Sequence, residues 1–126
     1  NCMNSDMQNK EYNTKSGIYE NKCGLDSTIC SWNHGEYLYH ILMYNKCTLP
    51  PEALHIIRYQ LLSLYHEKNE YFQFQSDTDV EYLKWIKLFT KYKDMSKNYT
   101  IYNLEELKEY YSSLIDKYFP KQEIVI

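Results

Sequence analysis

The sequence predicts a single all-α domain. Apolar residues recur at three- and four-residue spacing in several stretches, as in amphipathic helices. The alternation of apolar and polar residues that is typical of strands is not convincing anywhere. Only 3 Gly and 3 Pro occur among 126 residues, which argues against loop-rich, collagenous and disordered classes. A hydrophobic fraction of 44% is sufficient for one modest core.

Residues 1–22 differ in composition from the rest of the chain. They are polar and aperiodic, rich in Asn, Lys and Ser, and we expect an extended arm or loop there. Three apolar side chains are possible anchors of this arm: Tyr12, Ile18 and Tyr19. The helical domain is therefore expected to span residues 23–126.

The first helix is expected to begin near Asp26-Ser27-Thr28, all good N-cap residues, and to end near Asn45-Lys46. Gly35 interrupts it at a cost of about 1 kcal/mol relative to Ala. The apolar positions that define this helix are Ile29, Trp32, Leu38, Ile41 and Leu42.

The second helix has a strong start signal in Thr48-Leu49-Pro50-Pro51-Glu52, because proline is tolerated in the first helical turn. Helical spacing places Gln60 on its apolar face, where an amide needs hydrogen-bond partners. The positions on this face are Ala53, Leu54, Ile57, Gln60, Leu61 and Leu64.

Two further helices follow. One is expected to begin at Ser76-Asp77 and to end near Tyr92. The other is expected to begin at Asn103, with Glu106 placed as in a capping box, and to stop at Pro120. The Tyr- and Leu-rich stripe of this last helix is interpreted as core. The tail Ile124–Ile126 is expected to pack on a neighbour or to form a short edge strand.

Charge and composition exclude several classes. A net charge of −3 without a basic patch disfavours nucleic-acid binding. No segment approaches the roughly 18 consecutive apolar residues of a membrane span. The 4 cysteines contain no CxxC pair and are interpreted as reduced thiols of a cytoplasmic protein. Because the sequence begins with Asn1, we expect a fragment, a processed product or one piece of a larger protein.

Several blocks resemble the inositol oxygenase family, with their order and spacing preserved. They include Asn21–Asp26, Ser31–Tyr39, Leu49–Ala53, Ile57–Tyr59 and Tyr110–Tyr118. The match covers only the C-terminal half of the family's protein. The resemblance implies the C-terminal half of an HD-domain-like helical fold. It also implies a family activity, the oxidation of myo-inositol to D-glucuronate by O2 at a di-iron centre held by four histidines and two aspartates.

Three of those six ligand positions fall within this chain, and the resemblance assigns them to residues 34, 60 and 93. His34 is retained. Gln60 replaces a histidine, and an amide carbonyl is a poorer iron ligand than neutral imidazole. Lys93 replaces an aspartate, and a protonated lysine has no lone pair to donate. We therefore interpret His34 as a packing histidine and expect no metal or other cofactor in this chain.

The resemblance also bears on substrate positions. Lys97 matches a lysine that contacts inositol in the family, whereas Leu61 stands where the family has a serine. Gly35 stands where the family usually has an acidic residue. Lys93 is interpreted as an exposed lysine, with the alternative that its ammonium occupies the position left by iron.

Three functional hypotheses follow. The leading one is a degenerate inositol-oxygenase-like domain, catalytically inactive, that serves as a structural or interaction subunit. A half-domain should expose apolar faces, so a protein partner or complementary chain is expected to cover them. The alternative is an active di-iron inositol oxygenase completed by a missing N-terminal half, and only then is myo-inositol expected to bind. The third is a polyol or phosphate sensor that uses Lys97.

Overall fold

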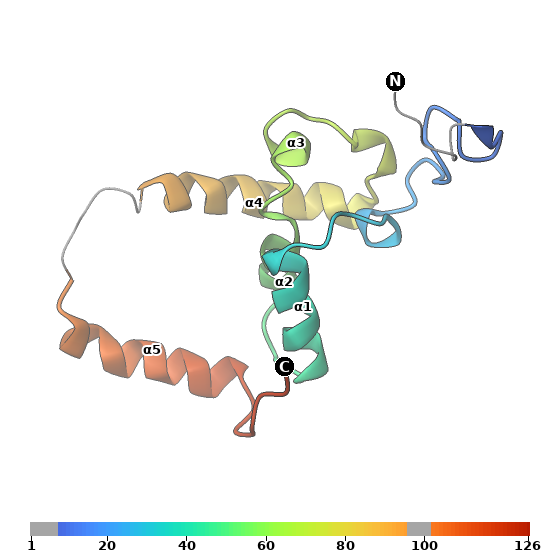
Figure 1. Cartoon of the computed structure of the whole chain (residues 1–126). Coiled ribbons are helices and arrows are strands. Elements are labelled where there is room, and N and C mark those ends of the chain that lie inside the picture. Colours follow the sequence, from blue (N-terminus) through green and yellow to red (C-terminus); the bar gives the residue numbers. More distant parts are fainter. Residues whose placement is uncertain (1–7, 96–101) are drawn as a thin grey trace.

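The computed structural model describes residues 8–95 and 102–126, and within these ranges all regular secondary structure is helical (Figure 1). The predicted all-α class is therefore confirmed. The elements are η2 (Leu25–Ser27), α1 (His34–Tyr44), α2 (Pro51–Tyr59), α3 (Ser63–His66), η3 (Phe72–Phe74), α4 (Asp77–Met95) and α5 (Leu104–Tyr118).

Helix α1 begins later than the sequence suggests. Its N-cap is Asn33, whose side-chain Oδ1 accepts hydrogen bonds from the backbone N–H groups of Gly35 (2.8 Å) and Glu36 (3.1 Å). The expected start near residues 26–28 is wrong, because that segment forms the short 3₁₀ helix η2 and then runs without regular structure to Asn33. Trp32 lies outside the helix and is 68% exposed.

Helix α2 begins at Pro51 as predicted but ends at Tyr59. Gln60 is its C-cap, and the chain then turns into the short helix α3. Leu61 therefore does not continue the apolar face of α2, and its side chain is exposed. Gln60 also lies at the helix end and not within the apolar stripe.

Helix α4 begins where the sequence predicts it, through a reciprocal cap. The backbone N–H of Ser76 donates to Asp79 Oδ2 (2.8 Å), and the backbone N–H of Asp79 donates to Ser76 Oγ (3.2 Å). Asp79 Oδ2 also accepts from the backbone N–H of Leu25 (3.0 Å), which ties η2 to the start of α4. The helix continues to Met95, three residues beyond the expected end.

The core lies where η2, α2, α3 and α4 meet. It contains Leu25, Tyr59, Tyr65 and Ile86, which are nearly or fully buried. Helix α1 packs along α2, and α2 packs on α4. Helix α2 thus lies between α1 and α4 in the packing of the chain (Figure 1).

Helix α5 stands apart from α4 (Figure 1) and buries no residue of its own. Its start at Asn103 and its end before Pro120 agree with the sequence, and the Asn103 amide donates to Glu106 as expected (2.8 Å). The interpretation of its aromatic stripe as core is wrong for this chain. Tyr110 and Ile115 are each 59% exposed, because no described helix packs along α5.

The connection between α5 and the rest lies at its C-terminal end. The backbone N–H of Thr48 donates to the carbonyl oxygen of Tyr118 (2.8 Å). The tail then returns to α1, where the buried Asn45 side chain donates to the carbonyl oxygen of Val125 (2.8 Å) and accepts from its N–H (2.9 Å). The tail therefore packs on α1 and forms no edge strand.

Residues 8–22 form turns without a long element. Tyr19 anchors them, because its hydroxyl accepts from the backbone N–H of Ile29 (3.0 Å) and its ring meets that of Phe74 edge-on. Tyr12 and Ile18 are exposed and are not anchors. The boundary at residue 22 stays a prediction. Within the described ranges, no helix is long and apolar enough to cross a membrane.

Candidate functional site

His34 and Gln60 lie at the same end of the α1 and α2 pair. His34 is the first residue of α1, and Gln60 follows the last residue of α2. The backbone of Gly35 approaches α2 so closely that an added β-carbon would stand 2.5 Å from the carbonyl oxygen of Ile57. The N-terminus of α1 therefore rests on the last turn of α2. In this arrangement the His34 side chain is exposed, which disagrees with its interpretation as a packing histidine, and that of Gln60 is half-buried.

The end of α2 is held by a histidine outside the expected ligand set. His66 is buried, and its Nε2–H donates to the backbone carbonyl of Gln60 at 3.1 Å. The resemblance assigns the ligand positions of this chain to residues 34, 60 and 93 only, and the structure gives His66 a positioning contact with the Gln60 backbone.

The other two expected site residues lie elsewhere. Lys93 occupies the last turns of α4 with an exposed side chain. It follows the fully buried Ile86 by seven residues, which corresponds to about 10 Å along the helix axis. This exposure favours the interpretation of Lys93 as a surface lysine over the alternative in which its ammonium occupies the position left by iron. Lys97 lies outside the described residues, so its expected contact with substrate stays a prediction.

The donors of this chain do not fit a di-iron centre by themselves. In the part of the chain that the structure describes, no three His, Cys, Asp or Glu side chains are grouped closely enough to hold a metal ion. His34 supplies one imidazole, whereas Gln60 and Lys93 supply an amide and an ammonium.

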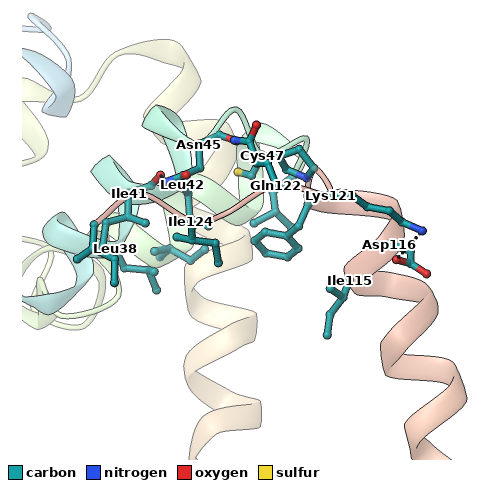
Figure 2. Close-up of a pocket in the computed structure, with 15 residues that line it drawn as sticks. Leu38, Ile41, Leu42, Asn45, Cys47, Ile115, Asp116, Lys121, Gln122 and Ile124 are labelled. Carbon is teal, nitrogen blue, oxygen red and sulfur yellow. Dashed lines mark hydrogen bonds and ion pairs between the residues drawn. The ribbon is translucent and has the colours of Figure 1, made fainter.

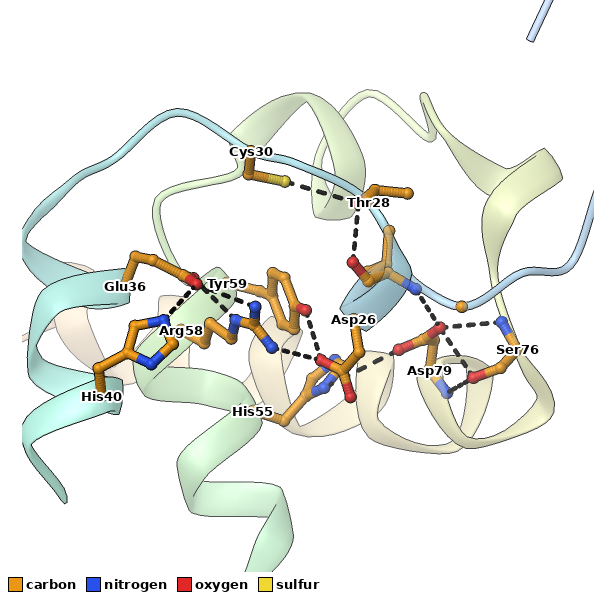
Figure 3. Close-up of polar contacts among 12 residues, drawn as sticks. Asp26, Thr28, Cys30, Glu36, His40, His55, Arg58, Tyr59, Ser76 and Asp79 are labelled. Carbon is orange, nitrogen blue, oxygen red and sulfur yellow. Dashed lines mark hydrogen bonds and ion pairs between the residues drawn. The ribbon is translucent and has the colours of Figure 1, made fainter. Parts of the chain in front are cut away.

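An ion-pair network links η2, α1 and α2 (Figure 3), and the sequence interpretation missed it. The Arg58 guanidinium donates to both carboxylate oxygens of Glu36 (2.7 and 2.9 Å) and to Asp26 (2.7 Å). The Tyr59 hydroxyl donates to the same Asp26 oxygen at 2.6 Å. The His40 ring adds a contact to Glu36 at 3.0 Å.

This network perturbs the acid–base properties of its members. The hydrogen bonds from Arg58 lower the pKa of Glu36, against the opposing effect of burial. Burial, together with the hydrogen bond to Asp26, raises the pKa of Tyr59. Both groups therefore keep their ordinary charge states near neutral pH. The network is a structural device, since each of the three guanidinium nitrogens of Arg58 donates to a carboxylate and the guanidinium lies over the Tyr39 ring.

A second buried pair lies between α2 and α4. His55 Nδ1 is 4.0 Å from Asp79 Oδ1, and the two side chains are only 7% and 5% exposed. The ring contacts those of Tyr59 and Tyr82, and its buried Nε2 has no hydrogen-bond partner among the residues that the structure describes. Burial lowers the pKa of His55, opposed by the negative charge of Asp79.

One of these features carries a signal in the sequence. Ser76 and Asp79 have the spacing of a capping box, which predicts that Asp79 faces the backbone at the start of α4. The pairing of Asp26 with Arg58 spans 32 residues and depends on how η2 meets α2. No spacing rule reports such a contact.

Comparison with known proteins identifies the family. The sequence profile of the family described as Myo-inositol oxygenase matches residues 2–125. Inositol oxygenase of Danio rerio is 43% identical over 117 residues, which are 93% of this chain and 42% of that protein. Inositol oxygenase 2 of Arabidopsis thaliana is also 43% identical over 117 residues, which are 93% of this chain and 37% of that protein.

The relationship extends to inositol oxygenase of Pongo abelii, which is 38% identical over 117 residues, covering 93% of this chain and 41% of that protein. The chain thus spans about two fifths of the length of the curated relatives it matches. Because the family profile covers nearly every residue of the sequence, this chain belongs to the myo-inositol oxygenase family.

Proposed function

We propose that this chain is a non-catalytic member of the inositol oxygenase family that serves as a helical subunit of a larger assembly. One observation carries the proposal. Of the three positions at which the resemblance expects iron ligands, only His34 has a suitable donor, while Gln60 and Lys93 do not. The affinity of a metal site depends on the identity and number of its donors, so the loss of two donors weakens an iron site.

The packing around these positions supports the same proposal. Arg58 and Tyr59 precede Gln60 directly, and they make the contacts that join α2 to η2 and α1. The helix that would carry an iron ligand is therefore firmly joined to η2 and α1, although the ligand itself has changed. A structural role needs those contacts and does not need the imidazole.

Iron analysis tests the proposal. The chain is mixed under anaerobic conditions with the part of the Danio rerio inositol oxygenase that it does not span, and the mixture receives Fe(II), O2 and myo-inositol. We expect fewer than two iron atoms per complex by elemental analysis and no D-glucuronate by mass spectrometry. Two iron atoms together with glucuronate formation would overturn the proposal. The complete Danio rerio enzyme is the positive control.

The second candidate is an active oxygenase completed by the N-terminal half that this sequence does not span, and the retained His34 favours it. Restoring ligands separates the two candidates. If the site is inactive only because its donors are lost, the double variant Gln60→His with Lys93→Asp gains iron in the same mixture relative to the natural chain. If the natural chain is already active, these changes bring no such gain.

A further inference from the structure

Two hollows in the described surface differ in the groups that line them. The groove between α1, the C-terminal end of α5 and the tail (Figure 2) has mostly apolar walls, and its charged residues Asp116 and Lys121 pair with each other at the surface (3.5 Å). A pocket of about 360 Å³ between α1, α2 and the first turns of α4 is lined in part by ionisable groups, among them the buried His55. The second hollow therefore adjoins a buried group that can change charge between pH 5 and pH 8.

The carboxylate of Asp79 joins three elements beside this pocket (Figure 3). Its Oδ2 accepts hydrogen bonds from the backbone N–H of Leu25 in η2 (3.0 Å) and from the backbone N–H and the hydroxyl of Ser76 at the start of α4 (both 2.8 Å). Its Oδ1 faces Nδ1 of His55 in α2 at 4.0 Å, which is too long for a hydrogen bond. One oxygen of Asp79 thus holds η2 to α4, while the other stands within reach of a small movement of His55.

The ring of His55 is enclosed by aromatic side chains. It contacts the phenol rings of Tyr59 in α2 and Tyr82 in α4, and α1 lines the same pocket with Tyr39. Its Nε2 is buried without a hydrogen-bond partner among the residues that the structure describes. A proton added to this ring therefore finds no acceptor at Nε2, and the carboxylate nearest to Nδ1 is that of Asp79.

Charged groups act on His55 from each of the surrounding elements η2, α2 and α4. Asp79 on α4 and Asp26 on η2 favour a positive charge on the ring, whereas Arg58 on α2 opposes it. Burial outweighs the two carboxylates and lowers the pKa of His55, so the ring is neutral at pH 7 in the folded chain.

Proton uptake would turn His55 into a charged donor that competes for Asp79. A hydrogen bond between such charged groups is about 2.7–2.9 Å long, so the contact has to shorten by about 1 Å. The Asp79 carboxylate can move together with Ser76, because both lie at the start of α4. Leu25 cannot follow as easily, since its neighbour Gly24 is fixed to η3 by a backbone hydrogen bond (2.8 Å). The hydrogen bond from Leu25 is therefore the one that breaks.

We propose that His55, Asp79 and Leu25 form a proton-sensitive latch between η2 and α4. With His55 neutral, Asp79 holds the N–H of Leu25 and the latch is closed. With His55 protonated, Asp79 turns to His55, and the buried N–H of Leu25 is released to water. Because the closed latch disfavours the protonated ring, the open latch takes up the proton more readily, and acidification favours opening. The latch contains none of residues 34, 60 and 93, so the inference is independent of iron binding and of the proposed function.

The test measures amide hydrogen exchange in the protein by NMR at pH 7.5 and pH 5.5, as protection factors corrected for the intrinsic exchange rates. The N–H of Leu25 is the reporter, because its acceptor is Asp79. The N–H of Gly24 is the matched internal control, since its acceptor is a backbone carbonyl, which does not titrate. The amide of the fully buried Ile86 reports unfolding of the core.

We expect the protection factor of Leu25 to fall about tenfold from pH 7.5 to pH 5.5, because one proton taken up with an ordinary pKa of about 6.5 shifts the opening equilibrium by that factor. Gly24 and Ile86 should keep their protection. His55→Phe should abolish the response of Leu25. His40→Gln should preserve the response, because it removes an exposed histidine that contacts Glu36 instead of Asp79.

A response of Leu25 that persists in His55→Phe would overturn the inference, and so would equal losses of protection at Leu25, Gly24 and Ile86, which would mean general unfolding. A second measurement needs no variant. In the natural chain, the pH midpoint at which the amide resonance of Leu25 shifts should coincide with the titration midpoint of the His55 ring. Two different midpoints would refute the latch.

Discussion

The backbone of Gly35 in α1 lies so near the carbonyl of Ile57 in α2 that a β-carbon on residue 35 would stand 2.5 Å from the Ile57 oxygen. Such a distance is incompatible with any side chain unless the helices separate. The glycine that departs from the family's usual acidic residue therefore has a packing role here. It sets how closely α1 approaches α2, and with it the position of His34 relative to Gln60.

We expect Gly35→Ala to lower the free energy of unfolding by about 2 kcal/mol, since overpacking a tight contact costs 1–3 kcal/mol. Gly35→Asp should cost at least as much, although it restores the acidic residue type of the family. Urea denaturation followed by circular dichroism measures both. Gly17→Asn is the control and should change stability little, because nothing lies within 4 Å of an added β-carbon there and Asn tolerates the left-handed φ of 62° better than other side chains. Equal effects at Gly17 and Gly35 would contradict the packing role.

Replacing Arg58 tests the ion-pair network. The side chains of Arg58 and Glu36 are each only 14% exposed, so Arg58→Met leaves a largely buried carboxylate without its partner. We expect a loss of about 3 kcal/mol in unfolding free energy. Arg58→Lys keeps the charge but not the bidentate geometry of the guanidinium. Its free energy of unfolding should therefore lie between those of the natural chain and the Arg58→Met variant. In a double-mutant cycle, Glu36→Gln should couple strongly to Arg58→Met, and additive effects would refute a direct interaction.

The buried His55 predicts a pH dependence of stability. Its pKa in the folded chain is below the ordinary 6.5, so the unfolded chain takes up the proton more readily. The contribution of neutral His55 to the free energy of unfolding is fully present above pH 6.5, and it is lost as the pH falls through the lowered pKa of the folded chain. The free energy of unfolding should therefore decrease on acidification from pH 7 to pH 5.

His55→Phe removes the titrating group and keeps a ring between Tyr59 and Tyr82. Its unfolding free energy should depend less on pH between 7 and 5 than that of the natural chain. Chemical denaturation at a series of pH values measures the slope. A slope that is the same in both proteins would show that His55 does not cause the dependence.

Asn45 is expected to hold the tail through two hydrogen bonds to Val125. Asn45→Ala removes both and should weaken tail attachment by about 2 kcal/mol, at roughly 1 kcal/mol for each bond. Asn45→Asp keeps the acceptor for the Val125 N–H but turns a buried carboxylate oxygen toward the carbonyl oxygens of Ile41 and Val125, so its effect should be at least as large. Hydrogen exchange of the C-terminal peptide, read by mass spectrometry, reports the change. Unaltered protection in Asn45→Ala would contradict this role.

The sequence predicts the helical class and the starts of α2, α4 and α5, because proline and capping residues act locally. It misplaces the start of α1, since Asp26 is a good cap by type but is used by Arg58 and Tyr59 instead. The sequence predicts that Gly35 interrupts a helix, whereas the structure shows that it allows α1 to approach the carbonyl of Ile57 in α2. Residues of the candidate site are found by family resemblance, whereas their exposure depends on contacts far apart in sequence.

The attachment of α5 has a consequence for the order of folding. Thr48 meets Tyr118 across 70 residues, and Asn45 meets Val125 across 80, whereas α1 and α2 are neighbours in sequence. Closing a long loop costs entropy before its contacts contribute, so the α1 and α2 pair should form first and the capture of α5 last. Mild denaturant should then populate a species in which α5 has swung free while the core persists.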